Sequence, residues 1–319
     1  MPLANAEFRA EFESWAASGK PPTGSLPLAA AALMSHAAFV EPVRQIAIFD
    51  AIAAAWLDLT SEQDRAALVG RELRFPAAAD APDGWETPRA VWDAFWAIVD
   101  TDPAAAAKQN NALDFTGRVV AIGMHYDREL LTRCEHAVLL HSDVQALLAE
   151  PEVRMTTEDL RNWPPDSLGT DLLNVLTSKG YDLEVINADD VLLPPIFPAQ
   201  NRTNRRILQL HDVWHLFAGY GFTAQGEVGI SAFQLAQFGQ NYSTRFLAVV
   251  TTATCLTKLV DVNQFISLIA EGWRHGRRAP PLMSVPWHKL LGKSIAELRA
   301  DIGVAPFKSR APEFLNFGG

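Results

Sequence analysis

Apolar residues recur at the spacing of an α-helix along most of this chain, and the alternation typical of β-strands is almost absent. One short stretch, residues 183–186, alternates like a strand. The chain therefore predicts an all-α fold, a multi-helix bundle. The main predicted helices are residues 43–59, 87–99, 126–148, 203–217, 224–238, 243–273 and 294–302.

Capping and turn residues add further boundaries. Ser61 with Asp64 predicts the start of another helix, and residues 76–88 read as a loop. Ser167 and Gly180 bracket a short helix. The prolines of residues 191–202 predict an extended segment, because proline is excluded from helix interiors.

The domain organisation follows from the same pattern. A chain of 319 residues that is 49% hydrophobic can bury a sizeable core. We place a boundary near residues 103–117. Residues 111–319 then form one helical domain that carries the site, and residues 1–110 form an added helical layer.

Composition excludes several classes of protein. The net charge of −10 disfavours nucleic acid as a partner, since binding phosphates needs a surplus of Lys and Arg. Cys134 and Cys255 each lie in apolar sequence and form no C-x-x-C pair, which predicts buried thiols and excludes a thiolate zinc site. The first twenty residues carry acids where a targeting peptide has bases.

The longest apolar run, residues 246–256, is shorter than the ~20 residues that a membrane span needs. We therefore expect a cytoplasmic protein, with peripheral contact at the inner face of the membrane left open.

The informative stretch is LQLHDVWHLFAGYGFTAQGEVGI, residues 208–230. On a helix, His211, Asp212 and His215 lie at roughly 0°, 100° and 40°, so all three project from one side. The two histidines are an i, i+4 pair, a spacing that lets two imidazoles reach one ion. Their neighbours are apolar, and charged groups in such surroundings need a partner, for which a cation is well suited.

Glu227 can join this set only if the chain reverses. On a continuous helix it would lie ~18 Å beyond His215, whereas metal–oxygen bonds are only ~2.0–2.2 Å long. Gly219, Gly221 and Gly226 allow a turn, so a helix–turn–helix could bring Glu227 over the histidines.

Two imidazoles and two carboxylates suit Zn²⁺, Fe²⁺, Co²⁺ or Mn²⁺, with zinc our first expectation. A zinc peptidase would place Glu directly after the first histidine, where this chain has Asp212, and a di-iron bundle would need a second Glu-x-x-His motif. A mononuclear site with an open position is the best match. A phosphohydrolase of the His-Asp superfamily would need a further histidine and aspartate. The candidates are His125, His136 or His141, and Asp261, but that class gives Glu227 no role.

These residues resemble the signature of the coenzyme Q biosynthesis family Coq-four: His-Asp-x-x-His, eleven residues, then Glu preceded by Gly. The chain matches it with HDVWH at 211–215 and GE at 226–227. PEVRMTTEDLRNWPPDSLG, residues 151–169, and WRHGRRAPPLMSVPWHKLLGKSIAELRADIGV, residues 273–304, resemble two further family segments. The resemblance covers about residues 120–305.

The resemblance implies a role in ubiquinone synthesis, in which His211, Asp212, His215 and Glu227 hold the metal and carry the chemistry. The reaction would be oxidative decarboxylation and hydroxylation at ring carbon 1 of a polyprenylated 4-hydroxybenzoate precursor. His211, His215 and Glu227 are the firm ligands, and Asp212 is a fourth ligand or a proton-transfer group. Zinc carries no electrons, so oxidation would need iron, cobalt or an outside oxidant. The alternative is a non-catalytic scaffold that binds prenyl lipid and organises other quinone biosynthesis proteins.

The resemblance also implies an apolar cavity for the prenyl chain, and the wide apolar faces after the motif are compatible with it. A homodimer is a further expectation. Two basic clusters flank the motif: Arg202, Arg205 and Arg206 before it, and Arg274, Arg277 and Arg278 after it. Such clusters can simply be solvated or complement a helix dipole. We expect Arg277 and Arg278 to contact the substrate carboxylate or anionic lipid headgroups.

Overall fold

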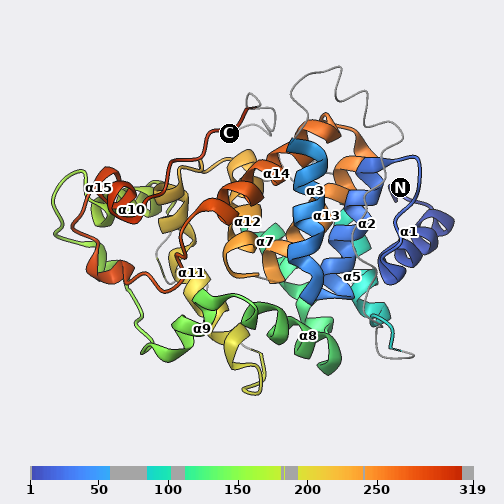
Figure 1. Cartoon of the computed structure of the whole chain (residues 1–319), viewed down its shortest axis with the longest axis horizontal. Coiled ribbons are helices and arrows are strands. Elements are labelled where there is room, and N and C mark those ends of the chain that lie inside the picture. The colour runs from blue at the N-terminus through green and yellow to red at the C-terminus, as the bar shows by residue number, and fades with distance from the viewer. Residues whose placement is uncertain are drawn as a thin grey trace.

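The computed structural model describes residues 2–57, 85–101, 112–180, 183, 193–239 and 241–310. Within these ranges every regular element is helical, as the periodicity predicts (Figure 1). The thirteen described α-helices are α1 (Ala6–Ser18), α2 (Leu26–Phe39), α3 (Gln45–Leu57), α5 (Arg89–Val99), α7 (Ala112–Ile122), α8 (Arg128–Leu139), α9 (Ser142–Ala149), α10 (Leu168–Lys179), α11 (Pro198–Ala218), α12 (Ala224–Phe238), α13 (Asn241–Thr257), α14 (Val262–Arg278) and α15 (Ile295–Ile302). Short 3₁₀ turns lie at Pro42–Arg44, Gly123–His125, Thr157–Leu160 and Trp287–Lys289.

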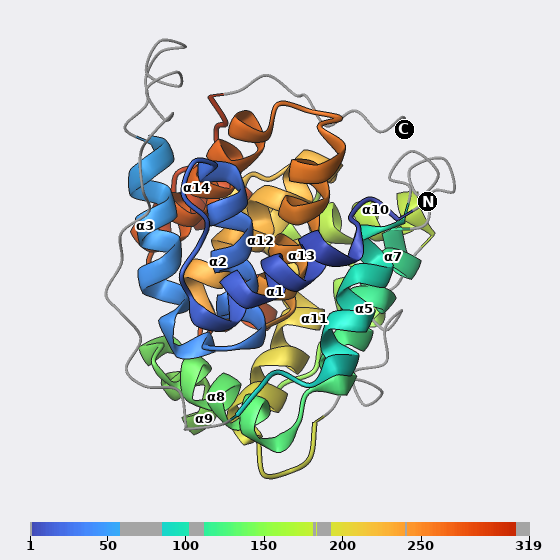
Figure 2. The ribbon, with the colours of Figure 1, turned by 90° about the vertical axis from the view of Figure 1, so that its right-hand side faces the viewer.

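The helices α12, α13 and α14 form the centre of the molecule, and the N-terminal helices lie against them. Figure 2 shows α1 and α2 in front of α12 and α13, with α3 to their left. The contacts span most of the chain: the Thr251 hydroxyl lies 3.3 Å from Met34 Sδ, and Trp273 Nε1 donates to Asp50 at 2.7 Å. One apolar core therefore joins the N-terminal layer to α12–α14.

A second core lies on the other side of α12. It gathers apolar side chains of α9, α10, α11 and α15 with the segment between α14 and α15. Phe217 of α11 packs against Trp287 with ring centres 4.9 Å apart, and Trp214 packs against Phe238 at 5.0 Å. The helix that carries the two motif histidines is thus clamped along its apolar face.

The apolar faces expected to line a prenyl cavity are covered by protein over much of their length. Leu247, Val249, Phe265 and Leu268 are almost fully buried in the core shared with α2 and α3. Leu259, at the turn after α13, is 57% exposed instead. The cavity stays a prediction.

Several predicted helix boundaries are confirmed. α10 begins after the capping hydroxyl of Ser167 and ends at Gly180, whose φ of 70° is left-handed. α12 covers the predicted residues, and α15 begins at a capping box of Ser294 and Glu297 and ends at Gly303.

Three predicted segments are corrected. Residues 126–148 are two helices, α8 and α9, broken where His141 takes an extended conformation. Residues 243–273 are also two helices, because Lys258 is left-handed with φ of 52° and Asp261 caps α14. The extended segment 191–202 ends early, since Pro198 starts α11, where its missing N–H costs nothing.

Some predictions fall wholly or partly outside the described residues. These are the helix start at Ser61 and Asp64, most of the 76–88 loop, and part of the boundary at 103–117. Of the possible strand at 183–186 only Leu183 is described, and it lies in a turn. Within the described ranges, no helix has both the length and the apolar character to cross a bilayer.

Candidate metal centre

The first half of the site is α11, which is fixed at both ends. At its start, the buried carboxylate of Glu135 accepts the backbone N–H groups of Ala199 and Gln200 at 2.7 and 2.9 Å. At its end, the Arg299 guanidinium donates to the carbonyls of Leu216 and Phe217 at 2.8 and 2.7 Å. Both contacts satisfy groups that a helix end leaves open. Glu135 and Arg299, which lie outside α11, thus fix the position of the helix that carries the two histidines.

A short turn then reverses the chain. α11 ends at Gly219, whose φ of 82° favours glycine, and the Thr223 hydroxyl caps α12 by accepting from Gly226. A Cβ on Gly226 would lie 1.7 Å from the carbonyl oxygen of Gly221. The glycine before Glu227 is therefore needed for the backbone to close this turn.

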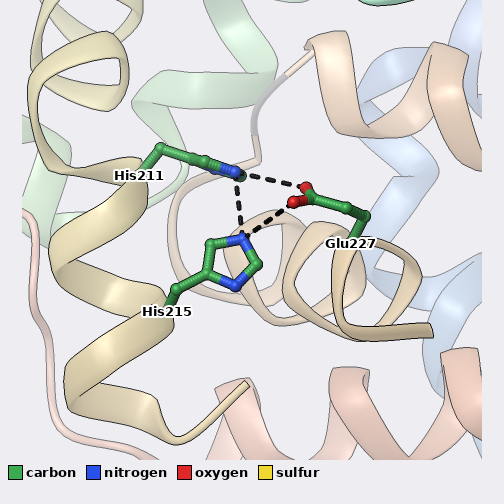
Figure 3. Close-up of side chains that lie close together, drawn as sticks. All are labelled: His211, His215 and Glu227. Atoms are coloured by element: carbon green, nitrogen blue, oxygen red, sulfur yellow. Dashed lines mark hydrogen bonds and ion pairs between the residues drawn. The ribbon is translucent and has the colours of Figure 1, made fainter. Parts of the chain in front are cut away.

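The reversal brings His211, His215 and Glu227 together, as the helix arithmetic required (Figure 3). The Nε2 atoms of the histidines are 3.1 Å apart, His211 Nε2 is 3.3 Å from Glu227 Oε2, and His215 Nε2 is 3.4 Å from Glu227 Oε1. Ligand atoms at the corners of a tetrahedron with bonds of ~2.0–2.1 Å stand about 3.3 Å apart. The two nitrogens and the Glu227 carboxylate are thus spaced to suit one small divalent ion.

Electrostatics couple the three groups. Partial burial alone would raise the pKa of the Glu227 carboxyl, but hydrogen bonds and positive charge from His211 and His215 bring it well below its ordinary value. Burial would likewise lower the pKa of His211, whereas the Glu227 and Asp212 carboxylates raise it above its ordinary value. Protons on the two imidazoles thus stabilise the Glu227 carboxylate, and a bound cation could take their place.

The two histidines differ in exposure. His215 is fully buried, its Nδ1 lies 3.3 Å from the carbonyl oxygen of Tyr220, and the Phe222 ring stacks on its imidazole at 4.6 Å. The side chains of His211 and Glu227 are 31% and 41% exposed. A ligand therefore reaches the centre from the His211 and Glu227 side.

A segment after α15, residues 305–310, braces the turn. The Phe307 N–H donates to the Ala218 carbonyl at 2.7 Å, and the Tyr220 ring stacks on Phe307 at 4.3 Å. The Tyr220 hydroxyl lies 2.9 Å from His275 Nδ1, and His275 Nε2 lies 2.9 Å from the Ala305 carbonyl. The residue whose carbonyl holds His215 is thus held in turn by this segment.

With the site in view, comparison with known proteins identifies the family. The family model for coenzyme Q (ubiquinone) biosynthesis protein Coq4 matches residues 104–308. The chain belongs to the Coq4 family. This confirms the resemblance noted in the motif.

Curated Coq4 proteins are distant relatives. The chain is 26% identical over 167 residues to the mitochondrial ubiquinone biosynthesis protein of Zygosaccharomyces rouxii, which covers 50% of this chain and 48% of that one. It is 26% identical over 166 residues to the Yarrowia lipolytica protein, covering 49% and 60%. The chain therefore spans about half the length of the curated Coq4 relatives that it matches.

A solved structure shares the fold. The crystal structure of a protein from Nostoc punctiforme, described as a candidate ubiquinone biosynthesis protein, aligns with a TM-score of 0.50 at 22% identity. The alignment covers 67% of this chain and 96% of that one. About a third of this chain thus has no counterpart in the Nostoc protein.

The two other segments that resemble Coq4 proteins meet in space. The N–H groups of Leu168 and Gly169 donate to the carbonyls of Lys293 and Leu291, both at 2.8 Å. The second segment also carries Arg299, which holds the end of α11. These segments build the frame around the centre.

Asp212 stands apart from the three-residue centre. It is half-buried beside His211, and its carboxylate is not among the ligand atoms that converge.

The first basic cluster and the other candidate residues also have separate partners or positions. Arg202 and Arg205 form ion pairs with Glu152 at 3.2 and 2.7 Å. Within the described residues His125, His136 and His141 join no metal-ligating group, and Asp261 caps α14.

The structure does not bring Arg277 and Arg278 to the centre. Both are exposed at the end of α14, and Arg277 Nε lies 4.0 Å from Asp50. α14 meets α12 through Gly272 and Gly276, which approach the carbonyls of Gly229 and Phe233. On α12 these two positions lie about 120–160° around the axis from Glu227. Contact of the arginines with substrate stays a prediction.

The sequence motif did not identify Gln234 as a residue of the site. Its amide nitrogen lies 2.9 Å from His211 Nδ1, and its side chain is almost fully buried. The signal was present, because Gln234 follows Glu227 by seven residues and two helical turns place both on one face.

Proposed function

We propose that this Coq4 protein acts on a polyprenylated 4-hydroxybenzoate precursor of ubiquinone, replacing the carboxyl group at ring carbon 1 by a hydroxyl at a metal centre of His211, His215 and Glu227. The observation that carries the proposal is the set of 3.1–3.4 Å contacts that join the two histidine nitrogens to each other and to the carboxylate oxygens of Glu227, across two helices. Membership of the family supports the pathway, and the donor set suits zinc, iron, cobalt or manganese.

The roles of the residues follow from their positions. Tyr220 fixes the ring of His215, and Phe222 keeps solvent from its face. The exposed sides of His211 and Glu227 leave room for a substrate oxygen. A bound divalent ion supplies Lewis-acid polarisation of that oxygen. Asp212, next to His211, is placed to take or return a proton.

The reaction sets its own requirement. Loss of the carboxyl group as carbon dioxide and gain of a hydroxyl from water remove two electrons from the ring, so dioxygen or an added two-electron acceptor must be present. Assays should therefore be run once with dioxygen and once with an added two-electron acceptor, and each candidate ion must be loaded separately.

The test combines metal loading with product analysis. The purified protein, stripped and reloaded with zinc, iron, cobalt or manganese, is expected to release carbon dioxide and give the ring-hydroxylated product. Glu227→Gln should abolish turnover and reduce metal binding. Glu158→Gln, a surface change beside Arg161, is the matched control and should behave as wild type. No turnover with any ion and oxidant would reject the proposal.

A second function is supported by the way the centre ties α11 to α12. A metal between these helices could serve a prenyl-lipid-binding scaffold for other quinone biosynthesis proteins, at a membrane surface or as a homodimer. If Glu227→Ala folds, retains lipid and still supports quinone synthesis in cells, the scaffold function is correct.

A further inference from the structure

Gln234 contacts the nitrogen of His211 that points away from the metal centre. Its side chain is 2% exposed, and its Nε2 lies 2.9 Å from His211 Nδ1. The other ring nitrogen of His211, Nε2, faces Glu227 and His215. Gln234 therefore touches the atom whose proton decides which nitrogen of His211 can bind an ion.

His215 and His211 are held by different kinds of group. His215 Nδ1 faces the Tyr220 carbonyl, which can only accept, so the Nδ1 of His215 carries a proton and its Nε2 is the atom that meets Glu227 or an ion. The Gln234 amide nitrogen lies 2.9 Å from His211 Nδ1 and can donate to it when Nδ1 carries no proton. The Nε2 of His211 then carries the proton and directs it to Glu227.

Binding an ion reverses this requirement at His211. A histidine that ligates through Nε2 carries its proton on Nδ1 and donates it to an acceptor beyond the ligand shell. A glutamine amide has a donor at one end and an acceptor at the other. A half-turn of the amide would place Oε1 against His211 Nδ1.

We infer that Gln234 is a positioning residue that serves both tautomers of His211, donating to its Nδ1 while that nitrogen carries no proton and accepting from it when Nε2 holds an ion. The inference rests on the metal centre of the proposed function. His215 is preset by a fixed carbonyl, whereas His211 is switched by a side chain that can turn. A glutamate at this position would favour the metal-bound arrangement, and an apolar side chain would support neither.

Gln237 provides the matched control. It lies three residues further along α12 and is also buried, but its amide donates to the Gly276 carbonyl at 2.6 Å and accepts from the Leu282 N–H at 3.1 Å. Replacing it removes a buried glutamine from the same helix without touching His211. Loss of stability alone can thus be separated from loss of histidine positioning.

The experiment is titration of the metal-free protein with Zn²⁺ and with Co²⁺, followed by calorimetry and by the visible spectrum of cobalt. Gln234→Leu should weaken binding roughly 10- to 100-fold, the usual effect of removing a partner of a ligating histidine. Gln234→Glu should bind at least as tightly as wild type. Gln237→Leu should melt earlier yet keep the wild-type dissociation constant.

Nitrogen NMR of the metal-free protein reads the same property without an ion. At a pH that keeps the imidazole neutral, His211 of the wild type should carry its proton on Nε2, and Gln234→Glu should shift it toward Nδ1. Wild-type affinity in Gln234→Leu, or equal weakening in the Leu and Glu variants, would overturn the inference. Failure of the wild type to bind either ion would reject the metal centre instead, and the proton position would still decide the role of Gln234.

Discussion

Asp212 is the one motif residue whose side chain does not converge with the other three. It lies ~100° around α11 from His211, and it acts on that histidine through charge and not through a shared ligand position. A carboxylate placed this way suits proton transfer at the edge of the centre.

We expect Asp212→Asn to keep bound metal and lose turnover. The amide preserves shape but cannot take a proton, so metal content should match wild type while product formation falls by about 10²-fold or more. Metal analysis and product assay on the same preparation would measure this. A loss of metal as large as that in Glu227→Gln would instead make Asp212 a fourth ligand.

His36 links stability to pH. It is 2% exposed, its Nδ1 lies 2.7 Å from the Ala16 carbonyl, and its Nε2 has no hydrogen-bond partner. Burial lowers the pKa of His36 to about 4, with Arg44 and Arg133 also lowering it against the hydrogen bond to Ala16. The folded protein therefore holds this ring neutral.

We expect the protein to lose stability as pH falls below about 6.5, the pKa of an unfolded histidine, because the unfolded chain then binds a proton that the folded chain rejects. At about pH 5 this group should cost about 2 kcal/mol of unfolding free energy. Urea unfolding of wild type and His36→Gln at neutral and acid pH would measure it. Equal acid losses in both proteins would contradict the assignment; His141, whose pKa burial also lowers to about 4, contributes to the pH dependence that both proteins share.

At the level of elements, the turn between α11 and α12 is the most demanding piece of backbone in the site. It holds the left-handed Gly219 and the close approach of Gly226 to the Gly221 carbonyl. A side chain at Gly219 would strain the backbone because of its positive φ, and a side chain at Gly226 would overlap the Gly221 carbonyl.

Gly226→Ala should damage the metal centre. The added methyl overlaps the Gly221 carbonyl, so the start of α12 must move and carry Glu227 away from the histidines. We expect weaker metal binding and a lower melting temperature. The control is Gly117→Ala in α7, where nothing lies within 4 Å; it should stabilise the protein by up to about 1 kcal/mol. Wild-type metal affinity in Gly226→Ala would show that the turn adapts.

Sequence patterns predicted these elements unevenly, for physical reasons. Local chemistry sufficed for α10, α12 and α15, whose capping residues stand in the sequence. For Glu227, helix length set the condition that the chain must reverse to bring it to the histidines, and the glycines allowed that reversal. The breaks at His141 and Lys258 were missed because they interrupt continuous helical patterns. The positions of Arg277 and Arg278 were beyond the pattern, since they depend on which face of α12 receives α14.

At the level of the whole molecule, the N-terminal layer and the helices after the motif share one core. Met34 of α2 meets Thr251, and Asp50 of α3 meets Trp273. More than two hundred residues separate these partners along the chain. We therefore expect α2 and α3 to fold together with α13 and α14 and not before them.

Leu33→Ala should reveal this coupling. Leu33 is fully buried in α2, and its truncation should cost about 2–5 kcal/mol. Hydrogen exchange should then show faster opening of α13 and α14 as well as α2, with one cooperative unfolding transition. Loss of protection confined to α2 would mean that the N-terminal layer opens by itself.

The brace formed by residues 305–310 has a consequence for biosynthesis. Protein synthesis proceeds from the N-terminus, so α11 and α12 leave the ribosome well before Phe307 can reach the Ala218 carbonyl. We therefore expect His211, His215 and Glu227 to be held loosely until this contact forms. The metal centre that we propose would then be completed late, when residues 305–310 pack against the turn.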